Sequence, residues 1–282
     1  MIENREVLIP TNQPHFPIAA FSHVGLVREN NEDRLEWQAF ITQADTFQNV
    51  LLAMLADGVG GHRAGEIAAR IAVESVLRNF AACQSLEHPT ELLTQAFLAA
   101  NEDVLQQAQS SEVWSGMGST CVCALLINSR LYAANLGDSR LYLARGQRLQ
   151  QLTYDHTWLE EIARRDRNGA DNIGRRHPLS HVLNRYLGTN EPVQVDVRLR
   201  PLSQNSNEVG FSLGEEGLEM LPGDSLLLTS DGVSDLLTND EMAAVVTIGT
   251  PQEAAQNLVN LALEKGGHDN ASVIVIRKPD MA

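Results

Sequence analysis

Five short acidic motifs are spread along the 282-residue chain, and each places an aspartate beside a glycine, an asparagine or a second acid. The aspartates are Asp33, Asp57, Asp138, Asp231 and Asp269. Three of them follow apolar runs that are typical of buried strands, at residues 50–55, 131–136 and 226–228. Carboxylates at the ends of core strands, next to small residues that allow close approach, are what a site for a hard cation requires.

A single Asp-Gly pair carries little information, because aspartate and glycine both favour turn geometry. Taken alone, Asp57-Gly58 and Asp231-Gly232 therefore fit turns as well as ligands. The same alternative applies to Asp138, which would then cap the bend of a hairpin. It is the number and order of the motifs that favour a shared binding site.

The composition is that of an ordinary globular chain, with 43% hydrophobic and 20% charged residues and a formal net charge of -15. Such an acidic chain is a poor partner for nucleic acid or an anionic membrane, so we expect neither. No apolar run is long enough to span a bilayer and no basic-then-apolar segment opens the chain, so we expect a soluble, cytoplasmic protein. The three cysteines predict no disulfide framework, and Cys121 and Cys123 are interpreted as buried strand thiols rather than a zinc site.

Periodicity and turn residues predict strands mixed with helices. Residues 1–17 are polar and contain three prolines, which predicts an extension that precedes the fold. Helices are expected at 64–80, 89–107, 154–167, 239–246 and 251–265, further strands at 120–127, 141–145, 193–199 and 272–276, and a long loop or hairpin at 203–217. Because many of the strands are sequence neighbours, the pattern indicates an α+β fold with antiparallel sheets.

The motifs sit within longer stretches that follow one another in a characteristic order. These are SHVGLVRENNED (22–33), ADGVGGHRAGE (56–66), GST (118–120), NLGDSR (135–140), LTYDHT (152–157), LPGDSLLLTSDG (221–232) and GGHDN (266–270). With this series the chain resembles the metal-dependent protein serine/threonine phosphatases of type 2C, in their bacterial form. The resemblance covers roughly residues 18–277, and a series of this length is far more specific than any single motif.

The resemblance implies a fold class and a domain. The fold would be a sandwich of two antiparallel β-sheets flanked by α-helices, formed by residues 18–277. A flap segment would occupy about 155–190, and a short tail would follow at 278–282. The arginine-rich stretches 164–167 and 175–176 fall in this flap, where they would attract a phosphopeptide or only balance acidic neighbours.

A metal centre is implied in the same way. Two Mn²⁺ or Mg²⁺ ions would lie between the sheets, bridged by a water and by Asp57, with the carbonyl of Gly58 on one of them. The shell of the first ion would be completed by Asp231 and Asp269. The second ion would be served by Asp33, or by Glu32 beside it. In the bacterial form, Asp138 would share a third, weaker ion with Asp231.

Two further residues match positions to which the family assigns chemistry. Arg28 matches the phosphate-binding arginine, whose guanidinium fork can hold two phosphoryl oxygens. His62 matches the histidine proposed as general acid for the alcohol leaving group, although it would alternatively only order a metal-bound water. The nucleophile would be a hydroxide bridging the two ions, so no cysteine nucleophile is needed. The sequence agrees, because none of its cysteines has an arginine six residues later.

We therefore expect a monomeric phosphatase that hydrolyses phosphoserine and phosphothreonine in proteins and opposes a serine/threonine kinase. Three alternatives stay open: a phosphatase-like regulator without turnover, a phosphatase of small phosphorylated metabolites, and a relative specialised for a regulator such as an anti-sigma-factor antagonist. Several polar residues within the motifs are expected to be structural rather than ligands: Ser119, Thr120, His156 and Asn270.

Overall fold

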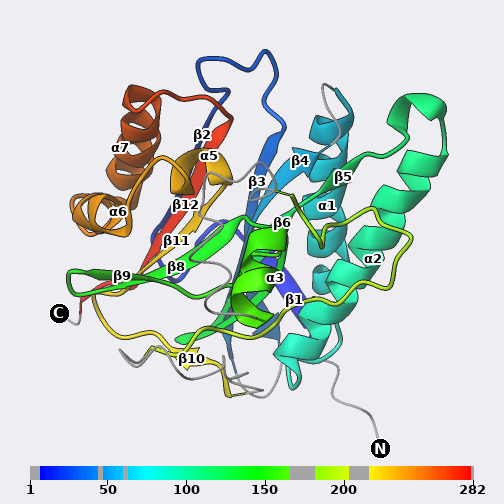
Figure 1. The fold of residues 1–282 in the computed structure, drawn as a ribbon. Helices are drawn as coiled ribbons and strands as arrows, with labels where there is room; N and C mark the ends of the chain where they lie inside the picture. Colours follow the sequence, from blue (N-terminus) through cyan, green and yellow to red (C-terminus); the bar gives the residue numbers. More distant parts are fainter. Residues whose placement is uncertain (1–6, 44–46, 60–62, 166–181, 203–215, 281–282) are drawn as a thin grey trace, which may run out of the picture.

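The computed structural model describes residues 7–43, 47–59, 63–165, 182–202 and 216–280 of the chain. Two antiparallel sheets pack face to face, and helices cover the outer face of each, which gives four layers (Figure 1). The predicted fold class, an α+β sandwich of two antiparallel sheets flanked by helices, is confirmed.

The first sheet carries most of the strands from the N-terminal half of the chain, together with the short β10. In the described residues its order from edge to edge is β1 (Val7–Thr11), β3 (Asp33–Gln43), β4 (Asn49–Val59), β6 (Cys121–Ile127), β7 (Arg130–Leu136) and β10 (Leu218–Glu219), and β5 (Gly118–Ser119) pairs with the end of β4. The long β3–β4 pair sets Asp33 directly opposite Asp57. Its register therefore decides that two of the motif aspartates are neighbours.

The second sheet collects strands from both ends and from the middle of the sequence. Its order is β2 (Ile18–His23), β12 (Ala271–Arg277), β11 (Ser225–Thr229), β8 (Arg140–Arg145) and β9 (Arg148–Gln151). Thr229, the last residue of β11, pairs with Arg140 on one side and with Val273 on the other. The motifs at Asp138, Asp231 and Asp269 consequently lie at the same end of the strands of this sheet.

Helices form the two outer layers. The helices α1 (Arg63–Ala81) and α2 (Pro89–Gln109) cover the first sheet, and α6 (Asn239–Val246) and α7 (Pro251–Glu264) cover the second. The other described helical elements are the 3₁₀ turn η1 (Glu112–Trp114), α3 (Trp158–Arg165) and α5 (Asp231–Ser234). The starts of α6 and α7 are fixed by capping boxes, in which Thr238 pairs with Glu241 and Thr250 with Glu253. Among the described helices, none is both long and apolar enough to cross a membrane.

The core is divided by the sheets into three apolar layers. Successive side chains of a strand point to opposite faces, so β4, which is apolar over residues 50–56, contributes to two of them. Leu52 and Met54 pack in the layer under α1 and α2, whereas Leu51 and Leu55 pack between the two sheets. A third layer joins the second sheet to α6 and α7. Truncating one such leucine to alanine typically costs about 2–5 kcal/mol, so these layers hold the strand ends in place.

Two expectations about the edges of the fold need correction. Residues 7–17 do not precede the fold: β1 pairs with β3 over its whole length, and Phe16 is buried between the sheets. Residues 193–199 form no ladder strand, since their backbone pairs with a neighbour only at Asp196, opposite Asn135. Their alternation nevertheless has a physical basis, because the three valines of this segment pack against the core under α1 and α2. The expected excursion at 203–217 lies almost entirely outside the described residues.

Candidate metal centre

All five motif aspartates lie at one end of the sandwich, which we call the acid end. Asp33 begins β3 and Asp57 lies near the end of β4, where the two residues are register partners. Asp138 lies in the turn between β7 and β8, Asp231 begins α5 directly after β11, and Asp269 precedes β12. Antiparallel pairing brings these positions together although they span most of the sequence.

The electrostatics show that the five carboxylates interact. Burial raises the pKa of Asp57 well above its ordinary value, and the charges of Asp33, Asp231, Asp138 and Asp269 raise it further. The charges of the other four carboxylates therefore all raise the pKa of the central one, Asp57. This is the feature that a group of scattered turn aspartates would lack.

Two of the neighbouring carboxylates are perturbed in the same direction. Burial raises the pKa of Asp33 to about 7, although hydrogen bonds from Ser272 and Ser230 oppose the shift. Burial also raises the pKa of Asp138 to about 8, with the charge of Asp231 as the next cause. Carboxylates in this condition are costly to ionise unless positive charge is supplied.

The residues present fit a divalent cation. The Oδ1 atom of Asp33 is buried and has no hydrogen-bond partner among the described residues, while its Oδ2 accepts a hydrogen bond of 2.8 Å from Ser230. The carboxylates of the five aspartates are hard oxygen ligands, as Mg²⁺ and Mn²⁺ prefer. Within the described ranges, however, no three acidic, histidine or cysteine side chains already form a compact ligand set. The carboxylates thus converge without forming a closed cage.

Glycines allow the backbone to pack tightly around these aspartates. A Cβ atom added at Gly58 would lie 2.1 Å from the carbonyl oxygen of Gly65, in the first turn of α1. One added at Gly232 would lie 2.0 Å from the carbonyl oxygen of Asn270. Gly58 was expected to place its carbonyl on an ion, and the structure gives a steric reason for a glycine at this position, which is the close approach of α1.

Three residues expected to be structural hold the acid end in shape. The hydroxyl of Thr120 accepts a 2.9 Å hydrogen bond from the amide of Asp57, and the hydroxyl of Ser119 donates to the Asp57 carbonyl at 3.0 Å. The side chain of Asn270 accepts a hydrogen bond from the amide of Glu32 and donates to the carbonyls of Val24 and Asn30, which precede Glu32. Sequence reasoning had no signal for these contacts, because each joins residues more than 60 positions apart.

Arg28 lies at the rim of the acid end. Its Nη2 donates to Asp269 Oδ2 at 2.6 Å, and its side chain is 53% exposed. The hydrogen bond to Asp269 raises the pKa of Arg28, so the group stays charged. The structure therefore places a cation beside the carboxylates, with part of its guanidinium open to an anion from solvent.

Other predicted residues lie outside the described part of the chain. His62 belongs to residues 60–62, and the arginines at 167, 175 and 176 belong to residues 166–181. Of the remaining histidines, His156 is buried, and its Nδ1 accepts a hydrogen bond of 3.1 Å from the amide of Gly137, directly before Asp138.

An open groove of about 950 Å³ adjoins the acid end. Its lining includes Arg28, Asp138, Asp231 and Asp269, and it continues past Leu159 and along residues 234–239. The groove extends well beyond the carboxylates, so a ligand larger than a phosphate group can lie beside them.

Comparison with known proteins identifies the family. The model of the family described as protein phosphatase 2C matches residues 20–170, which is more than half of the chain. The chain belongs to the protein phosphatase 2C family. Members of this family are hydrolases, so the predictions of the family and of a phosphatase enzyme are confirmed.

Individual relatives agree over nearly the full length. The serine/threonine phosphatase stp of Listeria monocytogenes is 29% identical over 261 residues, covering 90% of this chain and 92% of the relative. The structure of the S. agalactiae serine/threonine phosphatase aligns with a TM-score of 0.76 at 26% identity, covering 93% of this chain and 99% of that one. The catalytic domain of the phosphatase PstP, determined in complex with two manganese ions, aligns with a TM-score of 0.71 at 30% identity, covering 94% and 99%.

Proposed function

We propose that this chain removes phosphate from phosphoserine and phosphothreonine side chains of proteins, using two Mn²⁺ or Mg²⁺ ions bound at the acid end. The observation that carries the proposal is the convergence of four carboxylates on a fifth, central one, Asp57. Membership of the protein phosphatase 2C family supports the same reaction, and the relative PstP was crystallised with two manganese ions.

The ligands we assign are the residues whose geometry and chemistry fit hard cations. Asp57 would bridge the ions, Asp231 and Asp269 would complete one shell, and Asp33 would serve the other. The carbonyl of Gly58 would be a further oxygen donor. Asp138 would join Asp231 at a third, weaker position, which the mutual influence of their charges supports.

Bound cations would lower the pKa of the attacking water and offset the negative charge that develops on the phosphoryl oxygens. The protein supplies the rest. Arg28 would turn part of its guanidinium from Asp269 to the phosphoryl group, for which a planar fork of N–H donors is well suited. We assign His62 the role of proton donor to the departing alcohol on the strength of the family motif, because serine and threonine alkoxides are poor leaving groups.

The groove supports a protein substrate rather than a small metabolite. It continues from Asp231 along the surface of α5 to the start of α6, and apolar residues such as Leu159 and Leu237 line it. An extended peptide carrying one phosphorylated side chain would fill such a groove, whereas a sugar phosphate would contact only the acid end. A kinase that phosphorylates the same proteins is the proposed counterpart of this activity, and we propose that the chain acts as a monomer.

Phosphate release from a phosphothreonine peptide, in Mn²⁺ and after addition of EDTA, tests the proposal. We expect chelation and Asp231→Asn each to remove nearly all turnover, because both take away an ion or its ligand. Asp103→Asn is the control, since Asp103 lies on α2 and pairs with Arg78, away from the acid end. Full activity in EDTA would contradict the metal dependence. A sugar phosphate hydrolysed as efficiently as the peptide would contradict the protein substrate.

A further inference from the structure

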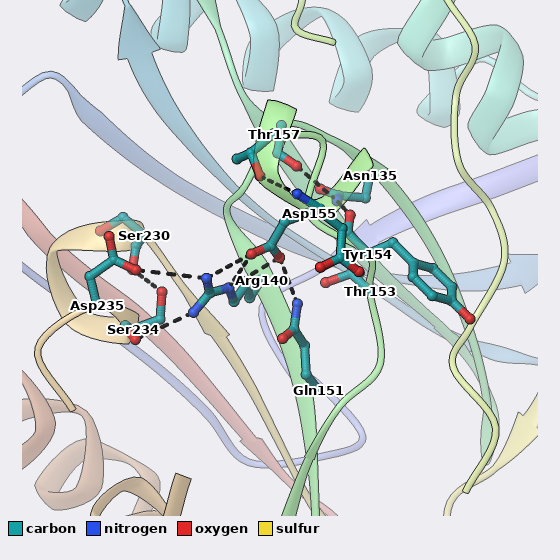
Figure 2. Close-up of polar contacts among 12 residues, drawn as sticks. Asn135, Arg140, Gln151, Thr153, Tyr154, Asp155, Thr157, Ser230, Ser234 and Asp235 are labelled. Carbon is teal, nitrogen blue, oxygen red and sulfur yellow. Dashed lines mark hydrogen bonds and ion pairs between the residues drawn. The ribbon is translucent and has the colours of Figure 1, made fainter. Parts of the chain in front are cut away.

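An arginine and an aspartate form a close, largely buried pair beside the acid end. Arg140 donates to Asp155 through Nε, at 3.1 and 2.9 Å from the two carboxylate oxygens, and through Nη2 at 2.6 Å. The two side chains are only 19% and 13% exposed. Figure 2 shows the pair with Gln151, whose amide donates to Asp155 at 2.6 Å.

The other side of the Arg140 guanidinium contacts the helix that begins with Asp231. Its Nη1 donates to the carbonyl oxygen of Ser234 at 3.3 Å, and its Nη2 lies 3.7 Å from Asp235 Oδ1. Ser234 is the last residue of α5, so a positive charge stands at the C-terminal end of this helix, where it is favoured. Arg140 thereby links β8 to the short element that carries Asp231 (Figure 2).

The segment around Asp155 is joined to the loop that carries Asp138. The side chain of Asn135 donates to the carbonyl of Tyr154 at 2.9 Å. His156 forms two bonds with Gly137, one from its own amide to the glycine carbonyl at 2.9 Å and one from the glycine amide to its ring. Asp155 is therefore fixed on both sides to the residues that precede Asp138.

Stability alone is a weak reason for such a pair. A buried ion pair loses much of its attraction to desolvation, and apolar residues of similar size often stabilise a protein as well. Burial is the largest influence on Arg140 and opposes its charge, but the charges of Asp155 and Tyr142 and the hydrogen bonds to both together raise the pKa of Arg140. What the pair does supply is fixed geometry, because a bidentate contact holds both planar groups in one orientation.

We propose that the Arg140–Asp155 pair sets the separation of Asp138 and Asp231, and thereby the affinity of the acid end for its divalent cations. Both are positioning residues: Asp155 is anchored to the loop before Asp138, and Arg140 is anchored to α5. This inference rests on the proposed metal-dependent function. It assigns a task to contacts outside the set of carboxylates that would bind the ions.

The chain contains a matched control on the same strand. Arg145, at the opposite end of β8, forms an equivalent fork with Asp224, with contacts of 3.0 and 3.2 Å from Nε and 2.7 Å from Nη2. Asp224 is 2% exposed, and this pair lies away from the acid end. Arg145→Lys removes the same fork geometry without touching the candidate metal centre.

Titration of Mn²⁺ into the full chain by calorimetry tests the proposal without relying on activity. We expect Arg140→Lys and Asp155→Asn each to weaken the lowest-affinity Mn²⁺ site by about 10- to 100-fold, as is usual when support behind metal ligands is lost. Arg145→Lys should leave the titration unchanged. With phosphopeptide as substrate, excess Mn²⁺ should restore kcat in Arg140→Lys, which a damaged fold would not allow.

The outcomes separate this inference from the proposed function. If the wild type takes up no Mn²⁺, the metal-dependent function fails and this inference fails with it. If the wild type binds Mn²⁺ and Arg140→Lys binds it equally well, only the inference is overturned. Should neither substitution at the pair give folded protein, Gln151→Ala decides, because it removes one support of Asp155 from the edge strand β9. Weaker binding is then expected, and unchanged binding overturns the inference.

Discussion

Each end of strand β8 carries an arginine paired with an aspartate, but the surroundings of the two pairs differ. We call the end of β8 that lies away from the acid end the far end. There Arg145 donates to the carboxylate of Asp224, which also accepts a 2.7 Å hydrogen bond from the amide of Leu221. Both oxygens of the Asp224 carboxylate therefore accept hydrogen bonds from the protein. At the acid end, Arg140 holds Asp155, but the carboxylates nearby outnumber the cations that the described residues supply.

The difference shows what distinguishes a structural ion pair from a candidate ligand. A buried aspartate with its own arginine is complete, and its removal should reduce stability only. Aspartates that surround one another raise each other's pKa values, and a bound cation would favour their ionised forms. Substitutions at one end of β8 at a time test this difference.

The largest contrast is expected between Asp57→Asn and Asp224→Asn. Loss of the central carboxylate should lower kcat by about 10³-fold, as expected when transition-state electrostatics are removed. The same change should raise the melting temperature of the metal-free protein, because it removes a buried carboxyl group whose ionisation burial and its acidic neighbours oppose. Asp224→Asn should do the reverse: melting at a lower temperature, with kcat of the folded protein unchanged. Equal losses of kcat in the two variants would contradict the distinction.

A second contrast lies in the pH dependence of the metal-free protein. The pKa values of Asp33 and Asp138 rise from 3.8 to about 7 and about 8 on folding, so above pH 4 the folded state binds more protons than the unfolded state. The free energy of unfolding must then fall as pH rises from about 4 to about 8, by a few kcal/mol for each group. Denaturant titrations at several pH values measure this slope.

Two further samples show which groups cause the change in the free energy of unfolding with pH. Saturating Mn²⁺ should flatten the slope, because bound cations favour the ionised carboxylates, and Asp138→Asn should reduce it by removing one of the groups that titrate. A slope that is the same in all three samples would place the titrating groups elsewhere.

A smaller effect is expected from adding a methyl group at each end. In Gly58→Ala the new Cβ meets the backbone of α1, and relieving the clash should cost about 1–3 kcal/mol and disturb Mn²⁺ binding. Gly146, in the turn after β8 at the far end, has open space around it but a φ of +61°. Gly146→Ala should therefore cost about 1–2 kcal/mol, through backbone strain alone, and leave Mn²⁺ binding unchanged. Melting curves with and without Mn²⁺ distinguish the two.

The sequence predicted the parts of this molecule that depend on local pattern. Apolar runs followed by Asp57, Asp138 and Asp231 identified both the strands and the carboxylates, since strand period and turn chemistry are written within a few residues. The helix at Asn239–Val246 has the bounds that the sequence predicted, and the structure shows a capping box at its start.

What could not be predicted depends on which distant segments become neighbours. The strand β1 was hidden by Pro10 within it and by the prolines and polar residues around it, and its place at the edge of a sheet follows only from pairing with β3. Residues 193–199 alternate as a strand does, yet they bury their valines without joining a ladder. The support that Thr120 gives to Asp57 likewise exists only once β4 and β6 are side by side.

The most direct test is anomalous diffraction at the manganese edge from crystals grown with Mn²⁺. We expect two manganese ions at the acid end, both within coordination distance of the Asp57 carboxylate, and neither of them in crystals of Asp57→Asn. Manganese bound only elsewhere on the surface, in protein that still hydrolyses phosphopeptide, would contradict the proposal that these carboxylates form the catalytic metal centre.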